Sequence, residues 1–172
     1  KGNVIDPLDL IEKYSADALR FTLLSMASPG RDVKLSEDRV KGYRNFLNKI
    51  WNANNFLIQN ECSFNNVEKP NDLKVNINKW IYSEFLTKKD EIQKNIKGYR
   101  FDEAAKNAYQ FVWHSFCDWY LELSKTILFS DNQDAIKEVR NVSSFIFREI
   151  LIILHPFIPF ITENSIVFES SK

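Results

Sequence analysis

Residues that turn or break a chain are scarce in this sequence, with 4 Gly and 5 Pro among 172 residues. An all-β sandwich needs a turn about every 8–12 residues, and this chain has too few turn-forming residues for one. Hydrophobic residues make up 44% of the chain and aromatic residues 14%, which is ample material for a packed core. Few turns and a large apolar fraction together predict an all-α fold of long helices joined by few loops.

The turn signals that remain divide the chain into a short N-terminal piece and a bundle of four long helices. Asp6-Pro7 predicts the start of a first helix, because Asp is a favoured N-cap and Pro is tolerated at the first helical position. That helix should end at residues 28–30, where Ser-Pro-Gly follows. Gly98 predicts the end of one of the long helices. The four long helices are expected over residues 36–60, 72–97, 102–129 and 133–154.

Cysteine content and hydropathy indicate the compartment. Cys62 and Cys117 are too few and too far apart for a disulfide framework, so a reducing compartment is expected. The most apolar stretch, residues 145–161, is too short and too charged to span a bilayer, and no signal peptide is visible. We therefore expect a cytoplasmic protein without a membrane partner. The sequence begins at Lys1 and its only Met is Met26, which predicts that it is part of a longer protein.

The net charge of zero hides an uneven distribution of charges. Residues 1–100 carry 17 Lys and Arg against 13 Asp and Glu, while residues 101–172 carry 6 against 10. Residues 31–50 alone hold six basic and three acidic side chains. A basic region of this kind is compatible with a nucleic-acid partner, but solvated helix faces have the same composition. Charge alone leaves both interpretations open.

No set of residues in the chain predicts catalysis or metal binding. His114 and Cys117 are three residues apart, but a structural zinc site needs four ligands, and the other His and Cys are far away in sequence. There is no Gly-rich phosphate loop and no Ser/His/Asp spacing typical of hydrolases. We expect no catalytic residue, no metal and no cofactor in this chain.

The predicted helix over 36–60 has two distinct faces. A core-facing arc is expected to hold Val40, Tyr43, Leu47, Ile50, Trp51, Leu57 and Ile58. The opposite face carries one stripe, formed by Asn45, Lys49, Asn52 and Phe56. Unpaired bases are bound by stacking on aromatic rings, by amides at base edges and by cations near phosphates, and this stripe contains all three groups. Alternatively, Phe56 packs under the loop 62–71 or against a neighbouring domain.

Several segments resemble one protein family. The opening KGNVIDPLDLIEKYSADALRF is similar to the segment directly after the Lys-Met-Ser-Lys-Ser loop of class I aminoacyl-tRNA synthetases. The stretch ASPGRDVKLSEDRVKGYRNFLNKIWNANNFL resembles the valine–tRNA ligases within that class. FCDWYLEL over 116–123 and HPFIPFIT over 155–162 are also similar to sequences of the family. The resemblance spans nearly the whole chain and is most specific in the first sixty residues.

This resemblance implies an anticodon-binding helical bundle over 36–172, preceded by a stem-contact segment over 1–35 that links it to a catalytic domain. The implied partners are the anticodon loop of tRNA(Val) and the catalytic domain of the same polypeptide, and not DNA. The implied full-length enzyme attaches valine to tRNA with ATP and Mg. This chain starts after the Lys-Met-Ser-Lys-Ser loop and should be unable to activate valine by itself.

The resemblance also implies roles for individual residues. The family's anticodon contacts fall on the positions of Lys49 and Phe56, within the same stripe as Asn45 and Asn52. Candidate contacts to the tRNA backbone are Arg39 and Arg44.

The sequence departs from the family's pattern in three places. Ser15 replaces a usual Gly, Asn55 stands where Arg is common, and the sequence after Glu163 differs from the family's usual one.

Two alternatives remain open at this point. The chain could be the same domain of an isoleucine or leucine tRNA ligase, which a binding contest among the three tRNAs would decide. It could also be a helical protein-interaction module without RNA binding, which would show no affinity for tRNA at low salt.

Overall fold

The computed structural model describes residues 6–28, 30, 35–64 and 67–170, except for the side chains of 166–170. The described residues form helices and connecting turns without a β-strand, which confirms the predicted all-α class. Residues 1–5 and 31–34 of the expected stem-contact segment lie outside the described residues. In chain order the helices are α1 (Pro7–Tyr14), α2 (Ala16–Ser25), α3 (Glu37–Gln59), α4 (Asn76–Lys97), α5 (Phe101–Gln110), the π-helix η1 (Phe111–Leu121), α6 (Glu122–Leu128), α7 (Gln133–Leu154) and α8 (Pro159–Ser170).

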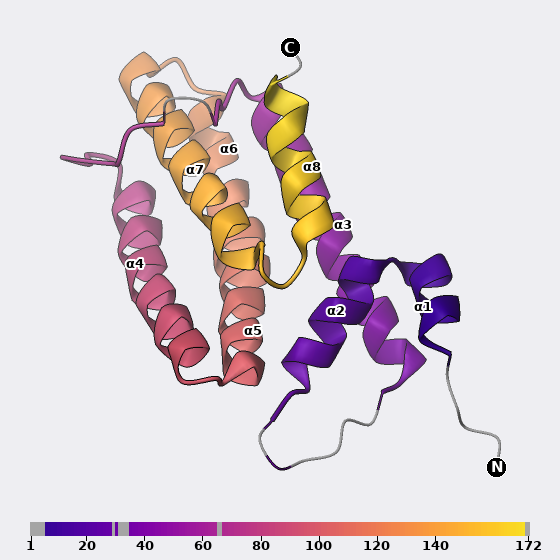
Figure 1. Ribbon diagram of the computed structural model, residues 1–172. Helices are drawn as coiled ribbons and strands as arrows, with labels where there is room; N and C mark the ends of the chain where they lie inside the picture. Colours follow the sequence, from indigo (N-terminus) through magenta and orange to yellow (C-terminus); the bar gives the residue numbers. More distant parts are fainter. Residues whose placement is uncertain (1–5, 29, 31–34, 65–66, 171–172) are drawn as a thin grey trace.

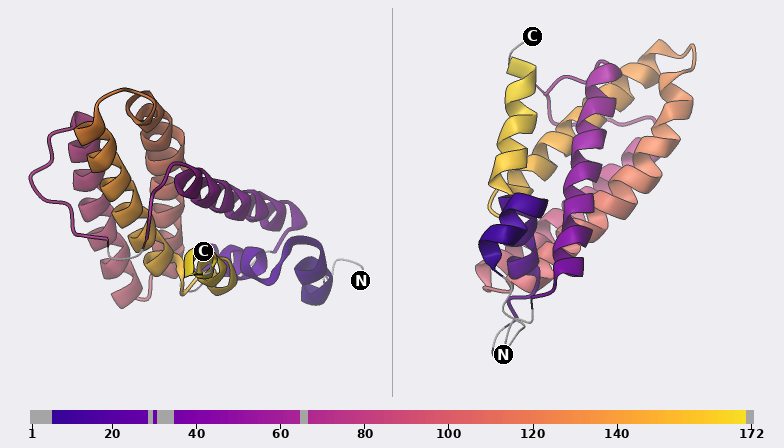
Figure 2. Two further views of the ribbon diagram at one scale, coloured as in Figure 1. Left: turned by 90° about the horizontal axis from the view of Figure 1, so that it is seen from above. Right: turned by 90° about the vertical axis from the view of Figure 1, so that its right-hand side faces the viewer.

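The helices form one bundle with a smaller N-terminal pair at its side. In Figure 1, α4, α7 and the α5–α6 column lie side by side, with α3 and α8 next to them and α1 and α2 at the lower right. The two views in Figure 2 show α3 as a long helix that extends from the bundle to the N-terminal pair. Helix α3 therefore contacts both parts of the molecule, since it packs against α1 and α2 as well as against η1, α7 and α8.

The N-terminal segment forms two helices, so the prediction of a single helix over residues 7–28 is wrong. Asp6 accepts a hydrogen bond from the Leu8 backbone N–H at 2.8 Å, as expected for an N-cap. The break is at Ser15, whose φ of 100° and ψ of 155° are incompatible with a helix. The hydroxyl of Ser15 then caps α2 by accepting a bond from the Ala18 N–H at 3.3 Å.

Helix α4 begins at Asn76, four residues later than predicted. Asp72, the predicted start, has a φ of 49° and lies outside the helix. The cap comes instead from α7, because Glu138 accepts hydrogen bonds from the backbone N–H groups of Lys74 and Val75 at 2.8 and 3.0 Å. Glu138 also accepts a bond from the Asn78 amide at 2.9 Å. A carboxylate at this end satisfies otherwise unpaired donors and opposes the positive pole of the helix.

The C-terminus of α4 lies at the predicted place but uses a different residue for the turn. The helix ends at Lys97, and Gly98 is its C-cap with an ordinary φ of −84°. The left-handed residue is Tyr99, with a φ of 58°. The N–H groups of Tyr99 and Arg100 donate to the carbonyls of Ile96 and Asn95, at 3.1 and 2.8 Å, which is the pattern of a Schellman motif.

The helix predicted over 102–129 is a continuous rod of three parts, and we call residues 101–128 the α5–η1–α6 rod. Its middle part, η1, is wound as a π-helix over 11 residues. π-Helices are rare, appear mostly as single turns inside α-helices, and are frequently found at functional sites. The rod packs against α2 and α4 through α5, against α3 and α4 through η1, and against α7 through α6.

Helix α8 follows the turn after α7, and the sequence pattern did not predict it. Its N-terminus is capped by the buried Asp17 of α2, which accepts hydrogen bonds from the Phe160 and Ile161 N–H groups at 3.3 and 2.8 Å. Helix α7 itself has the predicted bounds, with Asn132 as its N-cap.

A single core runs through the bundle and into the N-terminal pair. Its largest fully buried side chains are mostly aromatic: Tyr120, Phe21, Phe46, Phe85, Phe116, Phe147 and Phe157. Phe21 of α2 contacts Phe46 of α3 and Phe157 after α7, with ring centroids 5.2 and 5.9 Å apart. Among the helices in the described ranges, none is both long and apolar enough to cross a membrane.

Candidate nucleic-acid interface

Helix α3 buries more of its surface than its own sequence pattern indicates. Four residues of the predicted core-facing arc are buried as expected: Val40, Leu47, Ile50 and Leu57. Trp51, predicted to face the core, is only half-buried, and it lines a groove beside Phe160. Phe46 and Ala53, which were not assigned to the arc, are buried.

The predicted stripe on α3 is therefore not an open solvent face. Asn45 and Asn52 are exposed as predicted, but Lys49 and Phe56 are half-buried. Phe56 packs against the edge of the hydrophobic core. The fully outward orientation predicted for Lys49 and Phe56 is wrong, because η1 and α6 pack beside this part of α3.

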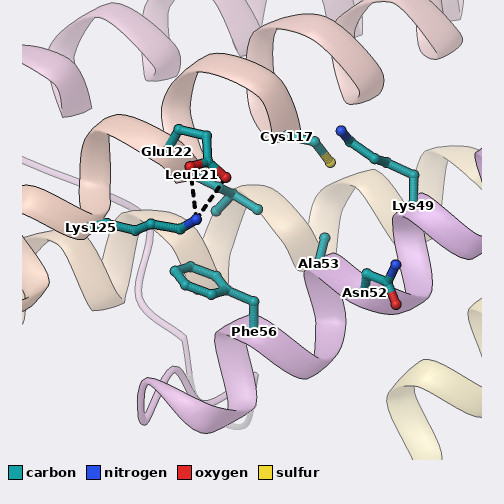
Figure 3. A pocket seen from close by; sticks show the side chains of 8 residues that line it. All are labelled: Lys49, Asn52, Ala53, Phe56, Cys117, Leu121, Glu122 and Lys125. Atoms are coloured by element: carbon teal, nitrogen blue, oxygen red, sulfur yellow. Dashed lines mark hydrogen bonds and ion pairs between the residues drawn. The ribbon is translucent and has the colours of Figure 1, made fainter.

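A groove of about 250 Å³ opens between α3 and the α5–η1–α6 rod. Figure 3 shows its two walls, one from α3 and the other from η1 and α6 of the rod. The α3 wall consists of Lys49, Asn52, Ala53 and Phe56, and the opposite wall consists of Cys117, Leu121, Glu122 and Lys125. We call this space the α3–α6 groove. It contains three of the four stripe residues, and Asn45 is not part of its lining.

Lys49 is held at one end of the groove by two contacts with η1. Its Nζ lies 2.5 Å from Oδ1 of Asp118 and 5.1 Å from the centre of the Trp113 ring. The second oxygen of Asp118 faces His114 Nδ1 at 3.4 Å. Both partners of the Lys49–Asp118 pair remain about one-third exposed. The ammonium group is therefore fixed in place and still accessible to a ligand.

Phe56 lies at the other end, with its ring beneath a second ion pair. Lys125 Nζ is 5.5 Å from the centre of the Phe56 ring and donates to both oxygens of Glu122, at 2.8 and 2.7 Å. Figure 3 shows the Lys125 side chain extending across the groove above this ring. A cation in this position is attracted by the negative face of the aromatic ring.

The Cys117 side chain in the rod wall of the groove offers a neutral thiol. Cys117 is buried, and its burial raises the pKa of the thiol to about 12, so the thiolate is absent at neutral pH. The charges on the two walls cancel in pairs, because Lys49 faces Asp118 and Lys125 faces Glu122. The arrangement suits a flat, largely neutral group with polar edges more than it suits a free anion.

The two arginines proposed as backbone contacts lie on other parts of α3. Arg39 lines a groove with Gly42, Tyr43 and Tyr109. Arg44 lines a third groove, on the α8 side of α3, which also contains Trp51 and Phe160. Both side chains are exposed, and neither lines the α3–α6 groove.

The wall that the rod contributes was not predicted from the sequence of α3. Asp118, Glu122 and Lys125 lie at spacings of 4 and 3, so they share one side of the rod. The stripe from Lys49 to Phe56 has the same kind of spacing. Two polar stripes of helical periodicity were therefore visible in the sequence, but nothing in it indicated that they face each other.

Comparisons with known proteins place the chain in a family. The family described as "Anticodon-binding domain of tRNA ligase" matches residues 78–170, and "tRNA synthetases class I (I, L, M and V)" matches residues 1–36. The valine–tRNA ligase of Pelagibacter ubique is 74% identical over 164 residues, and that of Mesorhizobium japonicum is 52% identical over 164 residues. The alignments cover 95% of this chain but 19% and 18% of those proteins, so the chain spans about a fifth of the length of these curated relatives.

A solved structure supports the same assignment at the level of the fold. The LeuRS of Agrobacterium radiobacter K84, in a ternary complex with tRNA and LeuAMS, matches 98% of this chain with a TM-score of 0.69 and 19% sequence identity. The aligned part is 20% of that protein. The resemblance found in the sequence is thus confirmed: the chain belongs to the family of anticodon-binding domains of tRNA ligases.

Proposed function

We propose that this chain is the anticodon-binding domain of a valine–tRNA ligase and that it holds the anticodon loop of tRNA(Val). The observation that carries the proposal is the α3–α6 groove. It brings an aromatic ring, an exposed amide and a fixed ammonium within one cavity of about 250 Å³. These groups are the ones that bind unpaired bases. The valine–tRNA ligases among the relatives and the tRNA in the LeuRS complex support the same function.

Each candidate residue receives a role in this proposal. Phe56 stacks on a base, and Asn52 and Lys49 bind the base edges or the neighbouring phosphate. Asn45, exposed on the same side of α3, extends the contact surface beyond the groove. Arg39 and Arg44 contact the tRNA backbone from their separate grooves. No residue of this chain has a catalytic role.

The chain is proposed to be one part of a longer parent enzyme. Residues 1–35 form the stem-contact segment that joins the bundle to the catalytic domain, and residues 36–172 form the bundle itself. The parent enzyme attaches valine to tRNA(Val) in the cytoplasm, using ATP and Mg at a catalytic site outside this chain. In support, the class I synthetase family matches residues 1–36, and the curated relatives are about five times longer than the chain. Asp17, Phe21 and Glu37 link the segment to the bundle through α8 and α3.

The experiment measures binding of a tRNA(Val) transcript to the 172-residue chain at two salt concentrations. Phe56→Leu keeps apolar volume at the core edge but removes the ring, and it should weaken binding by about 1–3 kcal/mol, the usual contribution of one stacked base. Tyr99→Leu is the matched control, because Tyr99 is an exposed aromatic residue at the other end of the α5–η1–α6 rod. A transcript with a swapped anticodon should bind more weakly and lose less with Phe56→Leu.

Three outcomes would contradict the proposal at different levels. If the wild-type chain does not bind tRNA at low salt, the proposed tRNA binding by this chain is wrong. If the isoleucine or leucine tRNA binds better than tRNA(Val), the parent ligase is a different one. If Phe56→Leu binds like the wild type, the α3–α6 groove is not where the base stacks.

A further inference from the structure

The face of the Phe56 ring that opens into the α3–α6 groove is already covered. Lys125 Nζ lies 5.5 Å from the ring centre, and Glu122 holds that ammonium through both of its oxygens (Figure 3). A base stacking on this face needs the space that the Lys125 side chain occupies. The structure thus shows the Lys125 ammonium over the Phe56 ring inside the groove, and a base stacked on this face of the ring would take its place.

The Lys125 ammonium is held over the ring by a weak ion pair. The Lys125 and Glu122 side chains are 39% and 61% exposed, and exposed ion pairs between neighbours on one helix contribute little to stability. Breaking such a pair should reduce the affinity of a ligand by only roughly twofold to fivefold. The cation–π contact would be replaced by the stacked base itself.

The two lysines of the groove differ in what holds them. Lys49 on α3 is fixed by Asp118 and Trp113 of η1, a different helix, so its position depends on the packing of the bundle. Among the described residues, Lys125 is held by Glu122, three residues away on the same helix, and by the ring that the base would cover. Of the two ammonium groups, Lys125 is the one that can move without disturbing helix packing.

We propose that Lys125 is a movable cover of the groove that becomes a phosphate ligand when RNA binds. In the free protein, Glu122 holds the Lys125 ammonium over Phe56. When a base stacks on Phe56, the ammonium moves aside and binds the phosphate of the stacked nucleotide. This inference rests on the proposed function, because it requires a base on Phe56. It assigns phosphate binding to Lys125 and leaves Lys49, already paired with Asp118, for the base edge.

The test compares two groove variants with matched controls in the 172-residue chain, with a tRNA(Val) transcript as the probe. Lys125→Met should weaken binding about tenfold at low salt, as expected for loss of one charge-assisted hydrogen bond. It should also reduce the slope of log K against log salt by about 0.7, the value for one phosphate contact of a single strand. Lys88 and Glu91 form a similar pair on α4, which is not among the helices that line the groove, so Lys88→Met should change neither quantity.

The Glu122→Gln variant tests whether Glu122 restrains Lys125 or acts only through its own negative charge. It should tighten binding by roughly twofold to fivefold, because Lys125 is released in advance, whereas Glu91→Gln should leave binding unchanged. The gain from Glu122→Gln should vanish when Lys125 is already Met, since no cation then remains to be released.

Each result supports or overturns the inference. If Lys125→Met leaves affinity and salt slope unchanged while Phe56→Leu weakens binding, Lys125 is not a phosphate ligand and the proposed function stands. If Glu122→Gln still tightens tRNA binding in the Lys125→Met background, the effect comes from removing a negative charge near the RNA. The proposed restraint of Lys125 by Glu122 is then wrong. If the wild-type chain binds no tRNA, the proposed function fails and this inference fails with it.

Discussion

Ser15 has backbone angles that are almost reserved for glycine. Its φ of 100° and ψ of 155° fall in a region that costs other residues about 1–3 kcal/mol. The family that the sequence resembles usually has Gly at this position. The turn at Ser15 lets α2 leave α1 at the angle that brings Asp17 to the N-terminus of α8. A strained residue therefore stands where α1, α2 and the N-terminus of α8 meet.

Ser15→Gly should stabilise the chain by about 0.5–1 kcal/mol. The substitution removes the backbone strain, and this gain exceeds the extra entropy of Gly in the unfolded chain and the small loss of the Ser15 cap on α2. Urea unfolding followed by circular dichroism measures the change. Ser15→Ala is the control, because it keeps the strain and loses the cap, and it should destabilise the chain by about 0.5–2 kcal/mol. Equal effects of the two substitutions would show that the turn is not strained.

Helix bounds were predictable where the signals are local and not where the cap comes from another helix. α3 and α7 have nearly the predicted bounds, since each follows a residue typical of an N-cap and contains no Pro. α4 starts late because its cap is Glu138 of α7, more than 60 residues away in the sequence. The break at Ser15 escaped prediction because Ser carries no signal for a positive φ.

The candidate site was predicted on one wall only, for the same reason. The periodicity of α3 identified Lys49, Asn52 and Phe56 as one stripe, and the structure brings all three into the α3–α6 groove. A helical wheel contains no information about neighbouring helices, so it assigned the stripe to solvent. The second wall, with Glu122 and Lys125, depends on how the α5–η1–α6 rod packs against α3, which no pattern within either helix specifies.

The packing of α3 changes which of its aromatic residues should matter for stability. The sequence pattern places Trp51 in the core, but Trp51 is half-buried, whereas Phe46 is fully buried against Phe21, Tyr109 and Trp113. Phe46→Ala should therefore cost about 3–5 kcal/mol, as expected for a large-to-small change in a core. Trp51→Ala should cost less, about 1–2 kcal/mol, because part of the Trp51 side chain is already exposed to water.

Thermal and urea unfolding of the two variants measure this difference. Phe46→Leu serves as the control for volume, and it should lie between the wild type and Phe46→Ala. If Trp51→Ala proves to be the more damaging change, the buried face of α3 is centred closer to the arc that the sequence pattern indicated.

Charged side chains connect segments that are distant in the sequence. Because these side chains ionise, the stability of the fold depends on pH. Asp102, at the start of α5, accepts a hydrogen bond from the Ser28 hydroxyl at 2.7 Å. It also accepts two from the Arg100 guanidinium, at 3.1 and 3.2 Å. The Arg100 guanidinium and then the Ser28 hydroxyl hold the pKa of Asp102 well below its ordinary value of 3.8. Asp17 behaves oppositely, because burial raises the pKa of its carboxyl above 3.8.

These two shifts predict pH dependences of opposite sign. A carboxyl with a lowered pKa in the folded state stabilises the fold above its unfolded pKa, and this stabilisation disappears as the pH falls below about 4. The free energy of unfolding of the wild type minus that of Asp102→Asn should thus be constant near neutral pH and decrease in acid. For Asp17→Asn the same difference should be largest in acid and decrease as the pH rises through the raised pKa, because ionisation of the buried carboxyl is unfavourable in the folded state. Urea unfolding at pH values from about 3 to 7 measures both curves on the same chain. If the two differences in free energy of unfolding change with pH in parallel, Asp102 is not held ionised by Arg100 and Ser28. The hydrogen bond that links the segment after α2 to the start of α5 then does not depend on the charge of Asp102.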